Sequence, residues 1–395
     1  MDARIKAILI AEGSADIEPE LLGTTKSLAS GQSTAGPGAG VKSFFFRSGG
    51  HRVRLEHRRD PDAALIVRRI YEEAAVGDMP DGSVDAGDAR VDAGIDAGSG
   101  GSNADIDENG DARAATEDGD GDTCDAADVG GEDVVIFCGG RELVRGRIEP
   151  ALLHCPEQAY ITLSESCIFD CTFCPVPKLG GRTKTAGEVM RMVDDASRTG
   201  NLHAISITSG IERSPGEEVT RAVDLVKSLT KYNLPIGVSV YPTGDSSIRL
   251  KEAGAVEIKY NVETMDREIF GRACADMDLD FVLASLEDAV DIFGENRVFS
   301  NFIIGLGESD RTVRGGVEML AGIGVIPILR ALNLHPLRPD LKNVCPDAAR
   351  PDADRLLRLA RFERKVLDAH GLRARVAETM CLSCGGCDLV PHWDV

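Results

Sequence analysis

The chain has 395 residues, 43% of them hydrophobic, and a formal net charge of −21. Its length suits one large domain with additions or two modest ones, and no apolar run is long enough to span a membrane. The charge does not indicate a nucleic-acid-binding surface, because residues 78–133 hold 15 Asp and 3 Glu against 2 Arg, a net −16 that leaves only −5 for the rest.

Residues 1–77 alternate short apolar runs with Gly/Ser-rich joints, which predicts a small α/β N-terminal extension without recognisable chemistry. Within it, Ala63 to Ala75 has the apolar spacing of a helix. Residues 134–157 are predicted as a β-hairpin lead-in, because an apolar, β-branched run is followed by the turn Gly139-Gly140 and a second short run.

Residues 78–133, between these two segments, consist largely of Asp, Gly, Ala and Ser and contain no aromatic residue. Such a segment buries too little apolar surface to offset its ordering entropy, so we expect a disordered acidic insertion. Asp105-x-Asp107-x-Asn109-Gly110 begins like a calcium-binding EF-hand loop, but Thr116 occupies the twelfth position and no amphipathic helix flanks it. The composition therefore favours disorder over a calcium site.

Residues 158–380 alternate apolar strand patterns with amphipathic helical patterns. The capping box Thr185-x-x-Glu188 marks one helix start, and Gly371 marks the end of the last long helix. This alternation predicts an α/β fold with parallel strands, a partial or near-complete TIM-like (β/α) barrel. The predicted strands are Ala159–Leu163, Ala204–Thr208, Ile236–Tyr241, Glu257–Val262, Val298–Ile304, Pro327–Leu332 and Arg375–Ala377.

Six of the eleven cysteines form two tight triplets, the second of them in a Cys-rich segment at 381–395. Without a secretory signal pattern, such clustering indicates metal ligation in a reducing compartment, hence a cytoplasmic protein. Three thiolates after the first strand can hold an iron–sulfur cluster and leave one iron open. Zinc is the alternative, but it usually takes four protein ligands. The triplets are Cys167, Cys171 and Cys174, and Cys381, Cys384 and Cys387.

The Cys-x3-Cys-x2-Cys spacing, with Phe173 just before the third cysteine, resembles the signature of the radical S-adenosylmethionine (SAM) superfamily. The resemblance implies a [4Fe–4S] cluster whose open iron binds SAM and whose electron cleaves SAM to a 5′-deoxyadenosyl radical. It implies an enzyme with no catalytic group beyond the cluster and SAM, supplied by an electron donor such as ferredoxin or flavodoxin. Phe173 would contact the adenine of SAM.

Three further stretches at strand ends resemble SAM-binding elements of that superfamily. Thr208-Ser209-Gly210 stands where the family has a Gly-rich turn for the amino group of SAM, although Ser-Gly replaces Gly-Gly-Glu, and Glu212 is a stand-in for the missing acid. Asn261-x-Glu263 is similar to the ribose-binding element of biotin and lipoyl synthases; the alternative is a carboxylate that caps a helix. The adenine-packing element is matched by Gly305, Gly307 and Glu308.

The second triplet has three interpretations, namely a second iron–sulfur cluster, which we favour, a zinc site, or a mobile thiol-rich tail. It follows the seventh predicted strand and is expected at the same rim of the barrel as the first triplet. A fourth ligand is sought among Cys345, Cys155 and Cys138, while Cys274 fits the core and Cys124 is incidental. Near the end of the sixth strand, a substrate carboxylate could bind to Arg330, His335 or Arg338.

A C-terminal cluster on such a barrel resembles the biotin synthase-related branch that includes two-component lipoyl synthases. The resemblance implies sulfur insertion into an unactivated C–H bond, with a lipoyl carrier protein or a second radical SAM subunit as partner. One alternative is a radical SAM dehydrogenase, methylating or carbon–carbon bond-forming enzyme whose second cluster relays electrons. The other is a non-catalytic iron–sulfur or zinc protein, which would not require the elements at Asn261, Glu263 and Gly305 to Glu308.

Overall fold

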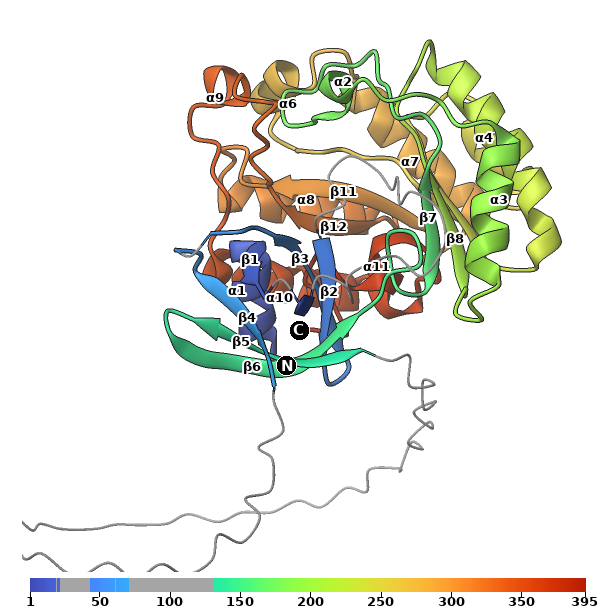
Figure 1. The fold of residues 1–395 in the computed structure, drawn as a ribbon. Coiled ribbons are helices and arrows are strands. Elements are labelled where there is room, and N and C mark those ends of the chain that lie inside the picture. The colour runs from blue at the N-terminus through green and yellow to red at the C-terminus, as the bar shows by residue number, and fades with distance from the viewer. Residues whose placement is uncertain (19, 22–42, 61, 71–130) are drawn as a thin grey trace, which may run out of the picture. The chain divides into compact units, whose positions relative to one another are not determined.

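Figure 1 shows the computed structural model of the chain, which describes residues 1–18, 20–21, 43–60, 62–70 and 131–395. The predicted acidic insertion and its calcium-loop pattern lie outside the described residues, apart from 131–133. The described strands form two groups, a closed six-stranded barrel and a six-stranded sheet. No helix within the described ranges is both long and apolar enough to cross a membrane.

The six-stranded sheet contains parallel strands that lie side by side in chain order. Helical segments join its neighbouring strands, so the predicted strand–helix alternation is confirmed, as an open, six-unit form of the (β/α) barrel. All six carboxyl ends therefore meet at one edge. The strands are β7 (Gln158–Thr162), β8 (Ala204–Thr208), β9 (Ile236–Ser239), β10 (Glu257–Lys259), β11 (Val298–Ile304) and β12 (Ile326–Ala331).

The long helices lie against the outer face of this sheet (Figure 1), and their ends follow the predicted signals. Thr185 and Glu188 form the capping box of α3, and the Ser214 side chain accepts from the Glu217 amide at the start of α4. The helices are α2 (Val176–Leu179), α3 (Ala186–Ser197), α4 (Pro215–Leu229), α5 (Ser246–Ala253), α6 (Arg267–Ala273), α7 (Leu279–Phe293), α8 (Asp310–Gly322), α9 (Leu341–Val344), α10 (Ala353–Ala369) and α11 (Met380–Cys384), with 3-10 turns η2 (Thr230–Tyr232) and η3 (Ala374–Val376).

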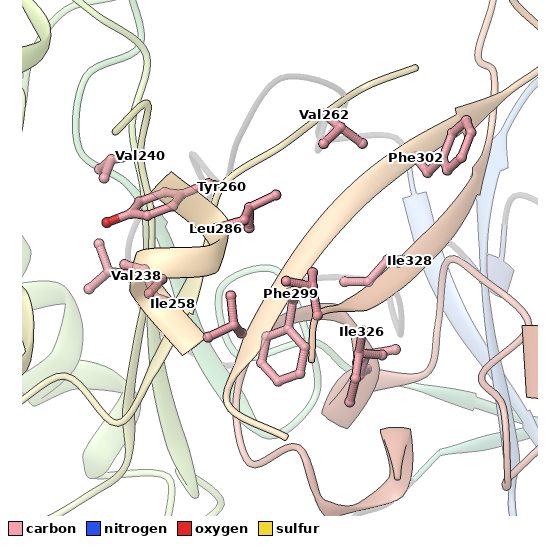
Figure 2. Close-up of a cluster of buried hydrophobic side chains, with 14 of the residues drawn as sticks. Val238, Val240, Ile258, Tyr260, Val262, Leu286, Phe299, Phe302, Ile326 and Ile328 are labelled. Carbon is pink, nitrogen blue, oxygen red and sulfur yellow. The ribbon is translucent and has the colours of Figure 1, made fainter. Parts of the chain in front are cut away.

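The main hydrophobic core lies between the sheet and these helices. Figure 2 shows Ile258, Tyr260 and Val262, from β10 and its continuation, grouped with Leu286 of α7. Because side chains alternate across a strand, the intervening residues at 257, 259, 261 and 263 face the other way, toward the inside of the partial barrel. The packing of β10 thus directs a row of polar side chains inward.

The N-terminal barrel differs from the predicted α/β extension. It is built from six strands in the order β1-β3-β2-β6-β5-β4, with β1 parallel to both β3 and β4, and its described residues include one helix, α1 (Ala3–Glu12). The predicted hairpin at 134–157 forms, with Gly139 and Gly140 at positive φ, but it completes this barrel. The strands are β1 (Ser14–Ile17), β2 (Ser43–Ser48), β3 (His51–His57), β4 (Leu65–Arg69), β5 (Glu132–Cys138) and β6 (Arg141–Glu149).

Two predicted elements are wrong. The helix predicted from Ala63 is strand β4 over Leu65–Arg69, because Leu65 and Val67 alternate into the barrel core while the strand pairs with β5; residues 71–75 lie outside the described ranges. The strand predicted at Arg375–Ala377 is the 3-10 turn η3. Its loss changes where the C-terminal cysteines lie.

Candidate active site

A pocket of about 430 Å³ occupies the inside of the partial barrel and reaches the carboxyl ends of its strands. The loops after β7 and β8 and the inner faces of β10 to β12 line it on one side. Arg54 and Glu56 of β3, with Gly13 at the end of α1, line it from the N-terminal barrel. Eleven of the predicted site residues line the pocket, namely Cys167, Cys171, Cys174, Phe173, Thr208, Ser209, Gly210, Asn261, Glu263, Cys381 and Cys387.

The loop with the first cysteine triplet is held in place by Arg338, whose side chain is 1% exposed. Its guanidinium donates to the Asp170 carboxylate at 2.5 Å and to the Cys174 carbonyl at 3.1 Å, and it pairs with Asp340 at 2.7 Å. The Ile168 amide donates to the Ile211 carbonyl, which ties the loop to the segment after β8. Arg338 therefore fixes the cysteine loop and, unlike Arg330 and His335, does not line the pocket.

The three thiols of this loop are half-buried beside one another. Burial raises the pKa of Cys167, and it raises the pKa of Cys174 to about 12. Cys274, predicted as a core residue, is buried and hydrogen-bonded to Cys171, and the Met277 sulfur lies 3.6 Å from the Cys171 sulfur. Metal binding at such thiols requires their deprotonation, so it is coupled to proton release.

The turn after β8 is positioned by Glu218, a residue that sequence reasoning missed. Its carboxylate, 1% exposed, accepts from the hydroxyls of Ser164 and Ser209 at 2.8 and 2.9 Å. A side chain at Gly210 would collide with the Ser166 carbonyl, so this position requires glycine. Glu212 pairs with Arg221 at 2.6 Å and does not line the pocket. The only sequence signal for Glu218 was its place in the first turn of α4.

Asn261 and Glu263 both face the pocket, as their spacing predicted. The Asn261 side-chain oxygen accepts from the Asn301 amide at 3.2 Å. Burial raises the pKa of Glu263 to about 7, against the opposing effect of Lys259 and a hydrogen bond from Asn261. Glu263 also has a positive φ of 58°, which is rare for a residue other than glycine and is common at functional sites.

Gly305, Gly307 and Glu308 lie outside the pocket lining, although Ile303 of the same stretch lies within it. The Glu308 carboxylate accepts from the Gly305 amide and pairs with Arg355 of α10, both at 2.9 Å. Gly305 has a φ of 117°, and a side chain there would collide with the Ala349 carbonyl. In this structure these three residues connect β11 to α10 and are not brought together with the cysteines.

The second cysteine triplet reaches the pocket from the opposite end of the strands, so its predicted place at the same rim is wrong. The segment before it packs on the amino-terminal halves of β7, β8 and β10. There Gln158 donates to the Met380 carbonyl, the Met380 amide to Ser206, and the Thr379 amide to Glu257, at 3.1, 2.9 and 2.9 Å. Figure 1 shows α11 and α2, which follows the first triplet, at opposite ends of the sheet.

The second triplet is also held by cations of the N-terminal barrel. Lys6 donates to the Gly385 carbonyl and pairs with Asp394, both at 2.6 Å, while Arg52 donates to the Cys384 carbonyl at 3.3 Å. A hydrogen bond from Cys155 and the nearby Arg52 lower the pKa of Cys384 to about 7 against the effect of burial. Cys381 and Cys387 line the pocket, and Cys384 does not.

No group of three or more His, Cys, Asp or Glu side chains in the described ranges is arranged for a single metal ion. A tetrahedral zinc site, with Zn–S bonds of about 2.3 Å, needs its sulfur atoms very close together. Cys124 lies outside the described residues. The donor set that faces the pocket is therefore two groups of thiols, one at each end of the strands.

Residues 161–320, from within β7 to near the end of α8, match the family model of the Radical SAM superfamily, so this part of the chain is a radical SAM domain. Methylornithine synthase is 17% identical, covering 60% of this chain and 72% of that one, with a TM-score of 0.43. A radical SAM methyltransferase from Sphaerobacter thermophilus is 20% identical, covering 65% and 72%, with a TM-score of 0.45. Coproporphyrinogen III oxidase from Escherichia coli is 16% identical, covering 45% and 42%, with a TM-score of 0.36. No curated protein matches the chain.

Proposed function

We propose that this protein is a radical SAM enzyme that binds SAM in the 430 Å³ pocket and abstracts hydrogen from a substrate held in the same space. One observation carries the proposal: the first cysteine triplet, Asn261 and Glu263 line one pocket within the radical SAM domain. A [4Fe–4S] cluster bound by Cys167, Cys171 and Cys174 would supply the electron that cleaves SAM to methionine and the 5′-deoxyadenosyl radical.

The protein's own groups bind and orient SAM in this proposal. The three thiolates supply all the protein ligands, so the fourth iron is left for SAM. Glu263, which lines the pocket, accepts hydrogen bonds from the ribose hydroxyls, and a hydrogen bond from Asn261 orients it. The Ser209-Gly210 turn, held by Glu218, offers backbone groups to the amino group of SAM, and Phe173 contacts adenine.

The test is the formation of 5′-deoxyadenosine from SAM by the anaerobically reconstituted, reduced protein. We expect turnover by the unaltered chain and none by Cys171→Ala. The matched control is Cys138→Ala, which removes a free, half-buried thiol of β5 outside the pocket and should retain activity. A reconstituted chain that binds iron but releases no 5′-deoxyadenosine would contradict the proposal.

The finer proposal is sulfur insertion with a second iron–sulfur cluster at Cys381, Cys384 and Cys387. It is supported by the place of the second triplet, since Cys381 and Cys387 reach the pocket from the end opposite the first triplet. A substrate between the two would face a radical source on one side and sulfur on the other. Electron relay by the second cluster is the alternative.

An octanoylated lipoyl carrier protein, the partner that the lipoyl-synthase resemblance implies, is the first substrate to test. Ferredoxin or flavodoxin is the proposed electron donor, in the reducing cytoplasm. Sulfur insertion predicts a mass increase of the carrier and loss of labelled sulfide from the protein. Cys384→Ala should still form 5′-deoxyadenosine but no sulfur product. Complete product formation by that variant would exclude the sulfur-donor role.

A further inference from the structure

Cys155, in the loop before β7, lies beside the second cysteine triplet. Its side chain is 2% exposed and packs in one buried cluster with Cys384, Cys381 and Tyr160. The Cys155 and Cys384 thiols are hydrogen-bonded to each other. Cys381 and Cys387 also lie within electrostatic range of Cys155. Four thiols from two distant parts of the chain therefore meet at the amino-terminal end of the strands.

The other two cysteines considered as a fourth ligand lie elsewhere. Cys345 follows α9, and the charged groups that act on it are Arg272, Glu308 and Asp266, close to α6. Cys138 ends β5 and packs against the core of the N-terminal barrel. Neither belongs to the small buried cluster that holds Cys155 and Cys384.

A buried cation without a partner points at the same thiols. Lys259 of β10 is 2% exposed and lines the pocket, yet its side-chain ammonium makes no hydrogen bond or ion pair with any residue that the structure describes. An unpaired buried ammonium is costly, so such a group normally has a counter-charge. Cys381 and Cys387 line the same pocket as Lys259, and the charges of Cys381, Glu263 and Asp388 act on it.

We infer that Cys155, Cys381, Cys384 and Cys387 together ligate a second [4Fe–4S] cluster at the amino-terminal end of the strands, with Lys259 as its buried counter-charge. The inference rests on the second cluster of the proposed function, but not on the cleavage of SAM. Four thiolates complete the protein ligation of four irons, so this cluster keeps no open iron for SAM or substrate. A cluster with four thiolates carries a net negative charge. It would therefore be the negatively charged partner that the Lys259 ammonium lacks.

The test uses the full chain with Cys167, Cys171 and Cys174 all changed to Ala, which removes the first triplet. After anaerobic reconstitution with iron and sulfide, we expect about four irons per chain and the EPR spectrum of one reduced four-iron cluster. Adding Cys155→Ala should lower the iron content or leave a three-iron cluster. Adding Cys345→Ala, which removes an equally buried thiol, should change neither.

Three results would overturn the inference: no iron in the triple variant, one zinc per chain in place of iron, or unchanged iron and EPR after Cys155→Ala. Cys155→Ser, which is closer in size to the native residue, is measured in parallel in case the Ala variant fails to fold. An unaltered EPR spectrum of the Cys155→Ser variant would also count against the inference.

Lys259→Met provides a second readout, because loss of a nearby cation should make the reduction potential of this cluster more negative while its iron stays bound. An unchanged potential would remove Lys259 from the inference. Failure of the proposed function is seen separately, as absence of 5′-deoxyadenosine from the unaltered chain even when both clusters are loaded.

Discussion

Glu363 of α10 is a fully buried carboxyl group, and neither of its oxygens has a hydrogen-bond partner in the described part of the protein. Burial, with Asp388 nearby, raises the pKa of Glu363 well above its ordinary value. The folded protein therefore keeps this proton to a higher pH than the unfolded chain, which releases it above about pH 4.3. A raised native pKa means that the stabilising contribution of the proton is lost as the pH increases.

Glu363→Leu is expected to raise the melting temperature, and to do so more at pH 8 than at pH 5. Removing a buried, unpartnered polar group should increase the free energy of unfolding by about 1–3 kcal/mol at the higher pH. Melting curves between pH 5 and pH 8 measure the effect. Glu287→Leu, at an exposed site on α7, is the control and should leave the pH dependence unchanged. Parallel curves for the Glu363 variant and the unaltered protein would contradict the assignment.

Glu263→Gln is expected to weaken SAM binding, because a carboxylate accepts hydroxyl hydrogen bonds more strongly than an amide does. The loss should be about 1.5–3 kcal/mol, roughly 10- to 100-fold in Kd. With its pKa raised to about 7, Glu263 ionises as the pH rises, so SAM affinity of the unaltered protein should increase from pH 6 to pH 8. Calorimetry on the reconstituted protein tests both points, with Glu268→Gln, an exposed change, as control.

Among elements, the cysteine loop depends on the buried guanidinium of Arg338. Arg338→Met should destabilise the fold by roughly 1.5–3 kcal/mol, because its hydrogen bonds to the half-exposed Asp170 and Asp340 and to the Cys174 carbonyl are lost. A chelator should also remove iron faster from the reconstituted Arg338→Met variant than from the reconstituted unaltered protein. Arg267→Met breaks an ion pair with Asp280 in which both side chains are mostly exposed, and it should change little. Equal iron retention by the two variants would show that Arg338 does not hold the loop.

The segment that carries the second triplet packs tightly inside the sheet at Gly237 of β9. A methyl group there would collide with the Thr379 side chain and approach Met380. We expect Gly237→Ala to lower the melting temperature by several degrees and to make the chain after α10 sensitive to proteases. Gly216→Ala, in the first turn of α4 with open space around it, is the control. Retained protease resistance in the Gly237 variant would mean that the segment adjusts without loss.

The elements that the sequence predicted well are those whose signals are local. The strands and helices after residue 158 are indicated by the spacing of their apolar residues and by capping residues such as Thr185 and Gly294. β4 was taken for a helix because its partner, β5, lies more than 60 residues away, and a short apolar run cannot reveal a distant partner. The strand predicted at Arg375–Ala377 is wrong because so short a pattern cannot distinguish a strand from the 3-10 turn η3, which contacts α11.

The same distinction holds within the candidate site. The first triplet, Asn261 and Glu263 could be named because each lies at a strand end with a recognisable spacing. Lys259 could also have been predicted as a pocket residue, since it is two residues before Asn261 on the same face of one strand. Cys155 could be named only as one candidate of three, because its contact with Cys384 spans 229 positions, and only the fold decides it.

At the scale of the whole molecule, the residues that flank the acidic insertion pair with one another. Arg69 is opposite Val134 in the ladder of β4 and β5, and the Ile70 amide donates to the Asp133 carbonyl at 3.0 Å. Replacing residues 72–130 with a short Asn-Gly turn should therefore close a hairpin and leave the barrel intact.

We expect the shortened protein to keep its melting temperature within a few degrees and to retain SAM cleavage and iron content. Adding calcium should not change the melting temperature of either the shortened or the full-length protein. A deletion extended through β5 is the control and should abolish folding, because it removes a strand of the closed barrel. A large loss of SAM cleavage in the shorter deletion would show that the insertion serves the reaction.

The buried ion pair of Lys6 and Asp394 has a consequence for how the protein is made. The two residues are 388 positions apart, and ribosomes add about 5–20 residues per second, so roughly 20 to 80 seconds separate their synthesis. During that time Lys6 lacks its carboxylate partner, and burying its charge alone costs several kcal/mol. The N-terminal barrel, although most of it is translated before the sheet, is therefore expected to close around α1 only after α11 and the residues up to Asp394 have been translated.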